Sequence, residues 1–286
     1  MYTTLISVQQ LKDLKTSGKA CMVFDCTGDL MKPEMADTLF ATVRIQGAHQ
    51  AHLDRNLSTH GSSAVNGGRH PLPSREEVAT WLGSLGFENH MQAVVYDRNG
   101  ANYCGRMWWM MKWLGHDAVA VLDGGLQAWE ASGGAVEKGA PAALKPIASK
   151  FELKSALREW VSTEQLAPQV GHPNLTLIDA RAGARYRGEM EPLDPVAGHI
   201  PGALNRPFAE NLGADGFFKS PEVLRAEFEK LLAGRDPATV VHHCGSGVST
   251  VPNILAMEIA GLGITRLYPG SWSEWCNTPG LPCAKG

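Results

Sequence analysis

The sequence predicts an α/β protein built from two tandem domains of similar design, each a mostly parallel β-sheet flanked by helices. Short apolar segments alternate with helical segments along the chain, and this alternation is typical of parallel sheets that helices cover. The same order of segments recurs roughly 150 residues later, which indicates an internal repeat. A chain of 286 residues with 44% hydrophobic content is long enough for two such domains.

The first half contains the expected segments in the order strand 21–26, turn 44–48, helix 74–85, strand 93–97, helix 103–114 and strand 119–122. The first of these helices is predicted to begin at Ser74, because Ser74 and Glu77 have the spacing of a capping box. The second helix is dense in tryptophan and methionine. We expect that helix to pack in the core rather than to bind a cofactor.

The second half repeats this order as strand 175–179, turn 199–203, a helix from Ser220, strand 239–243 and a helix that begins near Val251. Between the halves, residues 134–149 are rich in Gly, Ala and Pro and show no sustained apolar period, so we interpret them as a linker. The sequence therefore predicts one domain over 1–133 and a second over 150–286.

Composition excludes several classes of partner. The formal net charge of −3 and the absence of any Lys/Arg block argue against nucleic-acid binding. The first residues lack the basic start and long apolar stretch of a secretory signal. No apolar run approaches the roughly 20 residues of a membrane-spanning helix. We therefore expect a cytoplasmic protein without a membrane partner.

Cysteine usage and the glycine pattern bear on metals and cofactors. The six cysteines form no CxxC pair, which favours free thiols over a disulfide framework. The spacings of cysteine and histidine fit no zinc template, so we expect no metal site. Because no phosphate-binding glycine motif follows a strand, we expect no nucleotide and no other organic cofactor.

Cys244 is the most informative residue of the chain. It opens the run Cys-Gly-Ser-Gly-Val-Ser between a strand-like and a helix-like segment. Gly245 and Gly247 let the backbone curl so that N–H groups point at the sulfur, and the next helix adds the positive end of its dipole. Such surroundings favour a thiolate at the carboxyl end of a strand, where α/β proteins place their sites. The alternative is an inert cysteine at the end of a core strand.

The repeat supplies an internal comparison for this loop. Where the second half carries the run that starts His243-Cys244, the first carries a run that starts Asp97-Arg98. The nearest thiol of the first half, Cys104, lies seven residues beyond Asp97, and we expect it to be inside a helix. We therefore expect the first domain to be inactive and any thiol chemistry to belong to the second.

With these features together, the chain resembles the two-domain rhodaneses, the thiosulfate and 3-mercaptopyruvate sulfurtransferases. The resemblance covers nearly the whole chain and includes the segments 47–48, 51–54, 68–73, 96–97, 106–109, 122–125, 179–181, 185–188, 198–203, 244–249 and 268–272. It implies two rhodanese-fold domains, of which the C-terminal one is catalytic, and a cysteine persulfide intermediate.

The physical interpretation of the loop agrees with that chemistry. The Cys244 thiolate would take a sulfane sulfur from a small-molecule donor and pass it to an acceptor, which predicts ping-pong kinetics. The acceptor would be cyanide or a thiol, such as thioredoxin or glutathione. Backbone N–H groups from Gly245 through Gly247 and Val248 to Ser249 would cradle the persulfide anion.

The loop also bears on the identity of the donor. In the family that this chain resembles, an uncharged loop accompanies 3-mercaptopyruvate, whereas cationic loops accompany thiosulfate; this loop is uncharged. The resemblance further implies a proton relay, which matches Asp54, His70 and Ser246 and would handle the proton as pyruvate leaves. The alternative for His70 is a loop histidine that fixes the turn 69–73.

The arginines depart from the family pattern. Arg185 fits the first of the two arginines that the resemblance implies for binding the donor, but the second position falls near Leu193 and Asp194. Arg187 or Arg181 could take its place, because a guanidinium binds a carboxylate through two parallel hydrogen bonds. For Arg181, which follows Asp179 at a strand end, an ion pair that fixes the fold is the favoured alternative.

Two other functions compete with sulfur transfer. A non-catalytic persulfide carrier or binding module would load sulfur once but turn over poorly. A rhodanese-fold phosphatase needs a longer Cys-x5-Arg loop, and the position of that arginine is occupied here by Thr250. The sequence therefore favours the sulfurtransferase.

Overall fold

The computed structural model describes residues 1–141 and 149–286. These residues form two compact units, of which unit 1 comprises Met1–Thr59, Pro73–Leu157 and Asp215–Phe217, and unit 2 comprises His60–Leu72, Arg158–Ala214 and Phe218–Gly286. A short segment from the first half of the chain, His60–Leu72, thus belongs to unit 2. Residues 142–148 of the expected linker lie outside the described residues, and the expected boundaries at 133 and 150 stay predictions.

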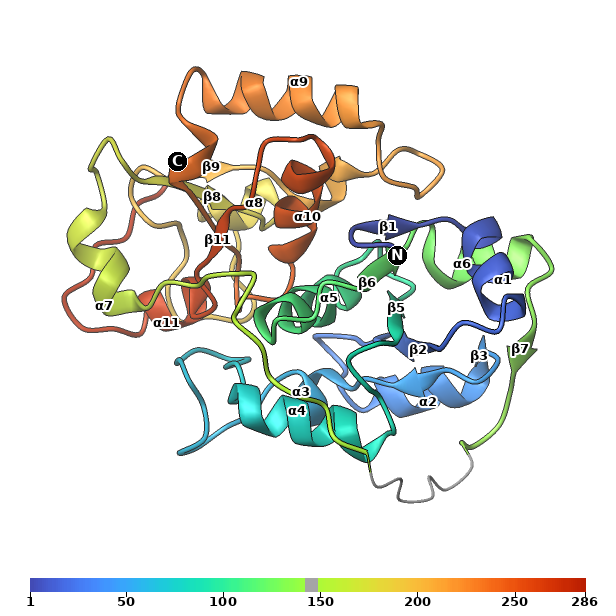
Figure 1. Ribbon diagram of the computed structural model, residues 1–286. Coiled ribbons are helices and arrows are strands. Elements are labelled where there is room, and N and C mark those ends of the chain that lie inside the picture. Colours follow the sequence, from blue (N-terminus) through green and yellow to red (C-terminus); the bar gives the residue numbers. More distant parts are fainter. Residues whose placement is uncertain (142–148) are drawn as a thin grey trace. The chain divides into compact units, whose positions relative to one another are not determined.

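Unit 1 is built around a parallel sheet with the strand order β1-β6-β5-β2-β4, and two further strands, β3 and β7, pair antiparallel (Figure 1). The strands are β1 (Leu5–Ile6), β2 (Cys21–Asp25), β3 (Arg44–Ile45), β4 (His49–Gln50), β5 (Gln92–Tyr96), β6 (Val119–Leu122) and β7 (Val136–Glu137). The helices are α1 (Val8–Thr16), α2 (Met35–Thr42), α3 (Leu53–Asn56), α4 (Arg75–Ser84), α5 (Cys104–Trp113) and α6 (Gly125–Ala131).

Helices cover both faces of the unit 1 sheet. Val23 of β2 faces the cluster that contains residues of α1 and α6. Its neighbour Phe24 points to the other face, because side chains alternate along a strand, and there it contacts Trp81 of α4. Helix α5 packs against β5 and β6, and all of its residues are buried, as expected for a core helix.

Unit 2 contains a parallel sheet with the strand order β11-β10-β8-β9. The strands are β8 (Thr176–Asp179), β9 (Leu204–Asn205), β10 (Val240–His243) and β11 (Arg266–Leu267). The helices are α7 (Thr163–Leu166), α8 (Gly183–Tyr186), α9 (Pro221–Leu232), α10 (Val251–Ile259) and α11 (Ser271–Trp275), with 3-10 turns η1 (Ala167–Gln169), η2 (Phe208–Asn211) and η3 (Pro237–Thr239).

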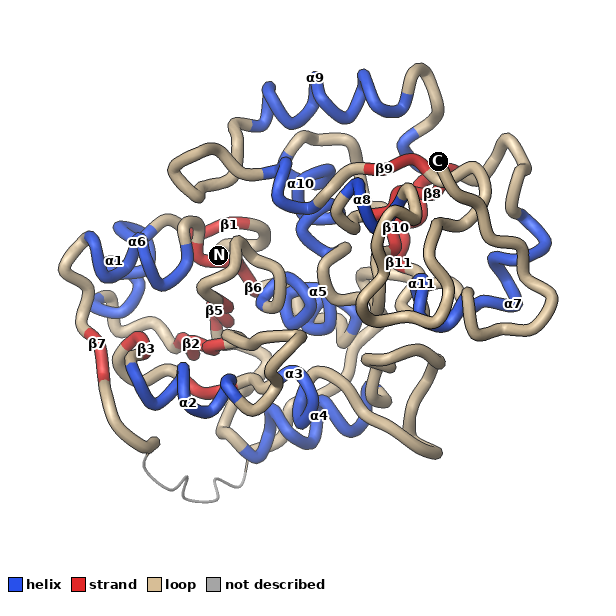
Figure 2. Tube along the Cα trace, turned by 180° about the vertical axis from the view of Figure 1, so that it is seen from behind, coloured by secondary structure: helices blue, strands red, loops and turns tan. Residues whose placement is uncertain are grey.

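The two faces of the central strand β10 pack against different helices of unit 2. Val240 packs with Phe228 of α9 and Met257 of α10 on one face. Val241, one residue on, packs with Trp272 of α11 on the opposite face. Figure 2 shows the strands of each unit between their helices. The predicted fold class, two tandem domains that each have a parallel sheet flanked by helices, is confirmed.

Two predicted helix starts are also confirmed. Ser74 caps α4, and its capping box with Glu77 is complete. Ser220 caps α9 through a hydrogen bond from the backbone N–H of Val223. All six cysteines are free thiols. Among the helices that the structure describes, none has both the length and the apolar character to cross a membrane.

Candidate active site

Cys244 lies at the carboxyl end of β10, between the neighbouring strands β8 and β11. The residue is buried, with 2% of its surface exposed. The loop 244–250 leads from it to α10, whose first residue is Val251. The structure therefore has the strand, loop and helix in the order that the sequence predicts.

The segment 268–273, which leads from β11 into the first turn of α11, supports the Cys244 loop. The Cys244 N–H donates to the Ser271 hydroxyl at 3.1 Å, and the Trp272 N–H donates to the Cys244 carbonyl at 3.0 Å. The Ser273 N–H donates to the Gly245 carbonyl at 2.8 Å. Gly247 has φ +74°, and a Cβ there would collide with the carbonyl of Pro269. These contacts fix the curled backbone of the Cys244 loop.

The register of the two sheets identifies the residue of unit 1 that corresponds to Cys244. Asp179 pairs with His243 in unit 2, and Asp25 pairs with Tyr96 in unit 1. The residue after Tyr96 is Asp97, so Asp97 stands where unit 2 has Cys244. The order of segments in the sequence predicts instead that Asp97 corresponds to His243, and this prediction is wrong by one residue. The difference arises because β5 begins and ends one residue earlier than its apolar segment suggests.

The side chain of Asp97 fills the loop of unit 1 as a buried anion. One carboxylate oxygen accepts the N–H groups of Asn99 at 2.8 Å and Ala101 at 3.1 Å. The other accepts those of Tyr103 at 2.8 Å and Cys104 at 3.0 Å. The loop of this fold is thus able to direct four backbone N–H groups at a negative charge that follows the central strand.

The same spacing leads from Cys244 to corresponding N–H groups in unit 2. Helix α5 begins seven residues after Asp97, and α10 begins seven residues after Cys244. The positions that match the four donors of unit 1 are Ser246, Val248, Thr250 and Val251. Ser246 and Val248 lie within the segment 245–249 that the sequence predicts as the cradle, and Thr250 follows this segment directly.

Ser246 and His70 meet at the mouth of this loop. The Ser246 hydroxyl lies 2.8 Å from Nδ1 of His70, and only 3% of Ser246 is exposed. His70 belongs to the segment His60–Leu72 of unit 2, which is tied to the Cys244 loop region because the Arg69 N–H donates to the Ser273 hydroxyl at 3.1 Å. Asp54, the third expected member of the relay, lies in the first turn of α3 in unit 1, and its role stays a prediction.

The side chain of Arg181 makes buried contacts that stabilise unit 2. Its guanidinium donates to the Asp179 carboxylate at 2.6 Å and to the Gly198 carbonyl at 2.7 Å, and it lies over the ring of Trp272. Both partners of the ion pair are almost fully buried. Burial disfavours a charged Asp179, yet His243 and Arg181 together hold the pKa of its carboxyl below the usual value. This arrangement agrees with the ion-pair alternative for Arg181.

Arg185 lies closer to the Cys244 loop. Its guanidinium pairs with the buried carboxylate of Glu191, at 2.5 Å for Nη2 and 3.2 Å for Nε. A Cβ placed on Gly245 would be 3.4 Å from Nη1 of Arg185. Arg187, by contrast, has a half-exposed side chain that pairs with Glu189. Of these two arginines, the structure brings Arg185 to the loop.

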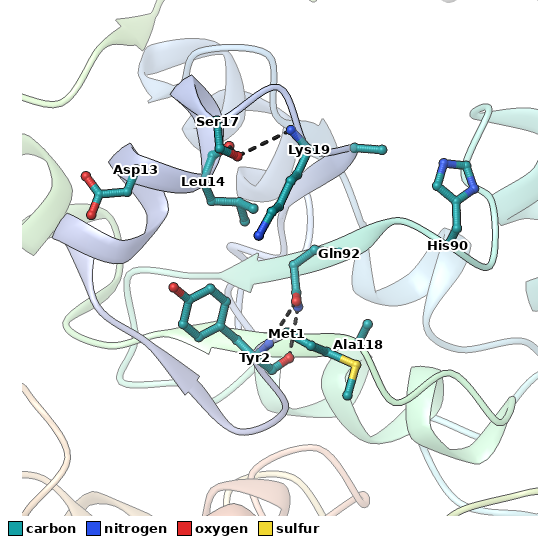
Figure 3. A pocket seen from close by; sticks show the side chains of 10 residues that line it. Met1, Tyr2, Asp13, Leu14, Ser17, Lys19, His90, Gln92 and Ala118 are labelled. Carbon is teal, nitrogen blue, oxygen red and sulfur yellow. Dashed lines mark hydrogen bonds between the residues drawn. The ribbon is translucent and has the colours of Figure 1, made fainter.

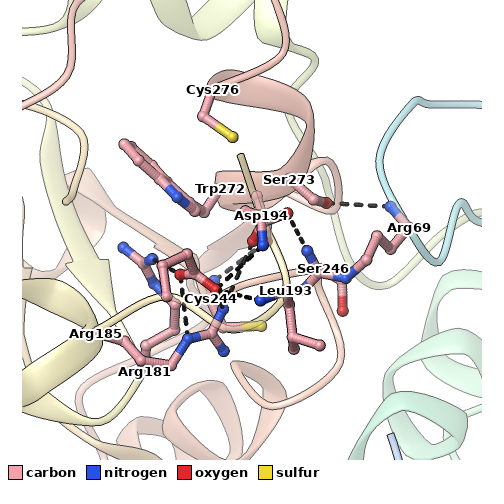
Figure 4. Close-up of polar contacts among 12 residues, drawn as sticks. Arg69, Arg181, Arg185, Leu193, Asp194, Cys244, Ser246, Trp272, Ser273 and Cys276 are labelled. Carbon is pink, nitrogen blue, oxygen red and sulfur yellow. Dashed lines mark hydrogen bonds and ion pairs between the residues drawn. The ribbon is translucent and has the colours of Figure 1, made fainter. Parts of the chain in front are cut away.

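Arg69 also reaches the loop, although the sequence analysis does not single out its side chain. Nη1 of Arg69 pairs with the buried carboxylate of Asp194, which in turn lies 3.5 Å from Nη2 of Arg185. Arg181 and Arg185 both pair with Glu191, and Figure 4 shows Arg69 entering from a separate segment. The available signal was its place next to His70 in the segment 68–73 of the resemblance.

Within residues 1–141 and 149–286, no three His, Cys, Asp or Glu side chains are grouped as metal ligands would be. A hollow of unit 1, shown in Figure 3, is lined by residues that include Tyr2, Lys19 and Gln92. Gln92 begins β5, so this hollow is at the amino end of the sheet, opposite the edge where Asp97 lies. It holds no cysteine.

Comparison with known proteins gives a consistent result. Residues 7–132 and 162–278 each match the model of the rhodanese-like domain. The chain is 42% identical over 283 residues to the "Probable 3-mercaptopyruvate sulfurtransferase" of Pseudomonas aeruginosa, a match that covers 99% of this chain and 98% of that protein. It is 38% identical over 210 residues to the thiosulfate sulfurtransferase of Bos taurus, covering 71% of this chain and 69% of the bovine protein.

Solved structures give the same picture. The chain superimposes on the 3-mercaptopyruvate sulfurtransferase from Leishmania major with a TM-score of 0.83 and 28% identity, and the match covers 98% of this chain and 76% of the other. The relatives carry the names of two different sulfur donors.

Proposed function

This chain belongs to the rhodanese family of sulfurtransferases, and from this premise we propose that it moves sulfur from 3-mercaptopyruvate to an acceptor through a persulfide on Cys244. The observation that carries the proposal is the correspondence of Cys244 with Asp97. In unit 1 the loop binds an anion with four backbone N–H groups. In unit 2 the same loop surrounds a thiol, whose anionic forms need the same donors.

The first half-reaction transfers sulfur to the enzyme. The Cys244 thiolate attacks the thiol sulfur of 3-mercaptopyruvate, so that an S–S bond forms as the C–S bond breaks. The electron pair of the C–S bond goes to the carbon as the enolate of pyruvate. The thiol proton of the donor ends on that carbon, which yields pyruvate and Cys244–S–S⁻. The donor carbon is reduced and the cysteine sulfur is oxidised, so no further redox agent is required.

The proton transfer is the proposed task of Ser246 and His70. Their hydrogen bond of 2.8 Å joins a hydroxyl in the Cys244 loop to an imidazole, a pair that can pass a proton between the thiol and the enolate.

The second half-reaction returns the enzyme to its starting state. An acceptor nucleophile, cyanide or a thiolate, attacks the outer sulfur of the persulfide, and the Cys244 thiolate leaves. With cyanide the product is thiocyanate. The donor reacts only with the free thiolate enzyme, and the acceptor reacts only with the persulfide enzyme. Because the two substrates react in turn with different enzyme forms, the kinetics should be ping-pong.

The choice of 3-mercaptopyruvate over thiosulfate rests on charge. Gly245, Ser246 and Gly247 add no cation to the loop, whereas a dianionic donor would favour cations there. Arg185 is proposed to bind the single carboxylate of 3-mercaptopyruvate, because its Nη1 lies beside Gly245.

The test is thiocyanate formation from cyanide with 3-mercaptopyruvate and, separately, with thiosulfate. We expect a higher kcat/KM with 3-mercaptopyruvate and no activity in Cys244→Ser. Cys283→Ser is the matched control, because Cys283 is an exposed thiol, and it should behave as wild type. Faster turnover of thiosulfate would overturn the donor, and activity in Cys244→Ser would overturn the persulfide.

A second measurement separates an enzyme from a persulfide carrier. Mass spectrometry of the protein after one exposure to 3-mercaptopyruvate should show one added sulfur atom per chain, lost on addition of cyanide. A protein that accepts one sulfur atom on Cys244 but forms no more than one thiocyanate per chain in the steady-state assay would be a persulfide carrier.

A further inference from the structure

The loop 65–72 of unit 2, which carries His70, is closed on itself. The Val65 N–H donates to the Leu72 carbonyl at 3.0 Å, and the Leu72 N–H donates to the side-chain oxygen of Asn66 at 2.9 Å. Because these hydrogen bonds join the two ends of the loop, the residues between them move together. The placement of the His70 imidazole therefore depends on what holds this loop.

The start of α11 holds the loop 65–72. A Cβ on Gly68 would lie 2.8 Å from both the Gly270 carbonyl oxygen and the Ser273 hydroxyl, and the φ of +93° at Gly68 also favours glycine. The N–H of the next residue, Arg69, donates to the same hydroxyl at 3.1 Å (Figure 4). Since the Ser273 N–H donates to the carbonyl of Gly245, the loop is docked on residues that also support the nucleophile.

The side chain of Glu274 fills the space between this loop and the start of α11. A Cβ on Gly67 would lie 2.9 Å from Oε1 of Glu274, and a Cβ on Gly270 would collide with Oε2. Neither glycine has a positive φ, so the backbone conformation does not require glycine at either position. Both positions need glycine because the Glu274 carboxylate occupies the place that another side chain would take.

The Glu274 carboxylate is unfavourable at this place by itself. Burial raises the pKa of its carboxyl above the usual value, the Gly67 N–H and the Thr163 hydroxyl oppose that shift in part, and the like charge of Glu164 adds to it. Its Oε2 is buried and has no hydrogen-bond partner. Proteins accept such local penalties mainly where a function requires them.

We propose that Glu274 is the positioning residue that holds the loop 65–72 against α11 and thereby keeps the His70 imidazole at its 2.8 Å distance from the Ser246 hydroxyl. The inference rests on the proposed function, in which His70 and Ser246 carry the proton from the donor thiol to the enolate. Glu274 acts through the loop and not on the reacting atoms.

The expected effect is on the rate of the chemical step rather than on donor binding. A displacement of about 1 Å in a catalytic group can lower a rate about 100-fold. Without the Glu274 side chain, the loop 65–72 loses the contact that spaces it from Gly270, and the imidazole is no longer fixed beside Ser246. The groups proposed to bind the donor do not include Glu274.

The experiment measures pyruvate release in the first turnover with 3-mercaptopyruvate. We expect Glu274→Ala to lower the rate at saturating donor about 10- to 100-fold, with the half-saturating donor concentration unchanged. Glu274→Gln should retain most of the rate, because the amide has the same shape and keeps an oxygen for the Gly67 N–H. Glu159→Ala removes an exposed glutamate of unit 2 and should behave as wild type.

Two measurements separate the positioning of His70 from a general structural role. In Glu274→Ala/His70→Asn the loss should equal that of His70→Asn alone, because a residue that acts through His70 has no effect once His70 is replaced. Inorganic polysulfide loads Cys244 as one S–S bond breaks and a shorter polysulfide anion leaves, without protonation of a carbon. This loading, followed by mass spectrometry, should be as fast in Glu274→Ala as in wild type.

Gly67→Ala tests the same contact from the side of the loop. Its methyl group would lie 2.9 Å from Oε1 of Glu274, so the loop or the carboxylate must shift. We expect a slower first turnover with 3-mercaptopyruvate and normal loading by polysulfide, as in Glu274→Ala. This variant keeps the Glu274 charge and decides the matter where Glu274→Ala does not fold.

The outcomes are distinguishable. A wild type that uses 3-mercaptopyruvate, together with Glu274→Ala and Gly67→Ala variants that match Glu159→Ala, would overturn this inference and leave the proposed function intact. Equal loss of loading by 3-mercaptopyruvate and by polysulfide, or additive losses in Glu274→Ala/His70→Asn, would also overturn it. A wild type that releases no pyruvate from 3-mercaptopyruvate would overturn the proposed function itself.

Discussion

Replacing Asp97 by asparagine tests whether the loop of unit 1 is an anion-binding cradle. Asp97 is 2% exposed and accepts four backbone N–H groups through two oxygens. In Asp97→Asn the amide keeps one oxygen, which serves two of these donors. The amide nitrogen then faces the other two, which lose their acceptor in a buried place.

The expected loss of stability follows from those contacts. A buried donor without a partner costs about 1–3 kcal/mol, so two cost about 2–6 kcal/mol. Two of the four donors, Tyr103 and Cys104, stand at the start of α5, where a negative charge also contributes about 0.3–1 kcal/mol. We therefore expect Asp97→Asn to destabilise unit 1 by about 2–7 kcal/mol.

Hydrogen exchange with mass spectrometry reads this effect locally. Amides of β5 and α5 should exchange faster in Asp97→Asn, whereas those of β10 and α10 should be unchanged. Asp13→Asn is the control, because Asp13 is an exposed residue of α1 and its loss should change little. Exchange of β5 and α5 as slow as in wild type would refute the reasoning, and with it the support that Asp97 gives to the cradle around Cys244.

Three further predictions concern other buried groups. Burial lowers the pKa of His242 to about 3, so its neutral form stabilises the fold above pH 6.5, and this contribution is lost as the pH falls from 6.5 towards 3. The free energy of unfolding, measured with urea, should fall by about 2 kcal/mol between pH 7 and pH 5 because of His242. An equal dependence of this free energy on pH in His242→Gln would contradict the prediction. Gly245→Ala should fold normally but lower kcat/KM for 3-mercaptopyruvate about tenfold, because its Cβ would displace the guanidinium groups of Arg69 and Arg185 that lie beside it; unchanged kinetics would show that their placement does not affect the reaction. Arg181→Gln leaves Asp179 buried without its partner and should destabilise unit 2 by about 3–5 kcal/mol in urea, whereas a loss of activity at full stability would make Arg181 a substrate contact instead.

The local elements were predictable because their signals are local. The capping box joins Ser74 and Glu77, which are three positions apart, and the helix it begins is the one observed. The strand Val119–Leu122 is continuous and apolar, as a strand buried on both faces must be. Boundaries moved by about one residue, and at β5 that shift changed which residue of unit 1 corresponds to Cys244.

The sequence by itself determined the repeated α/β fold, the free thiols and the place of Cys244 at the end of a strand, since each of these depends on residues that are close together in the chain. Only the tertiary structure decided which arginines serve the loop. Arg69 and Asp194 are 125 residues apart, and no local pattern in either segment indicates their ion pair. The pair forms because the segment His60–Leu72 folds with unit 2 rather than with the residues on either side of it, and such a contact is set by packing rather than by sequence spacing.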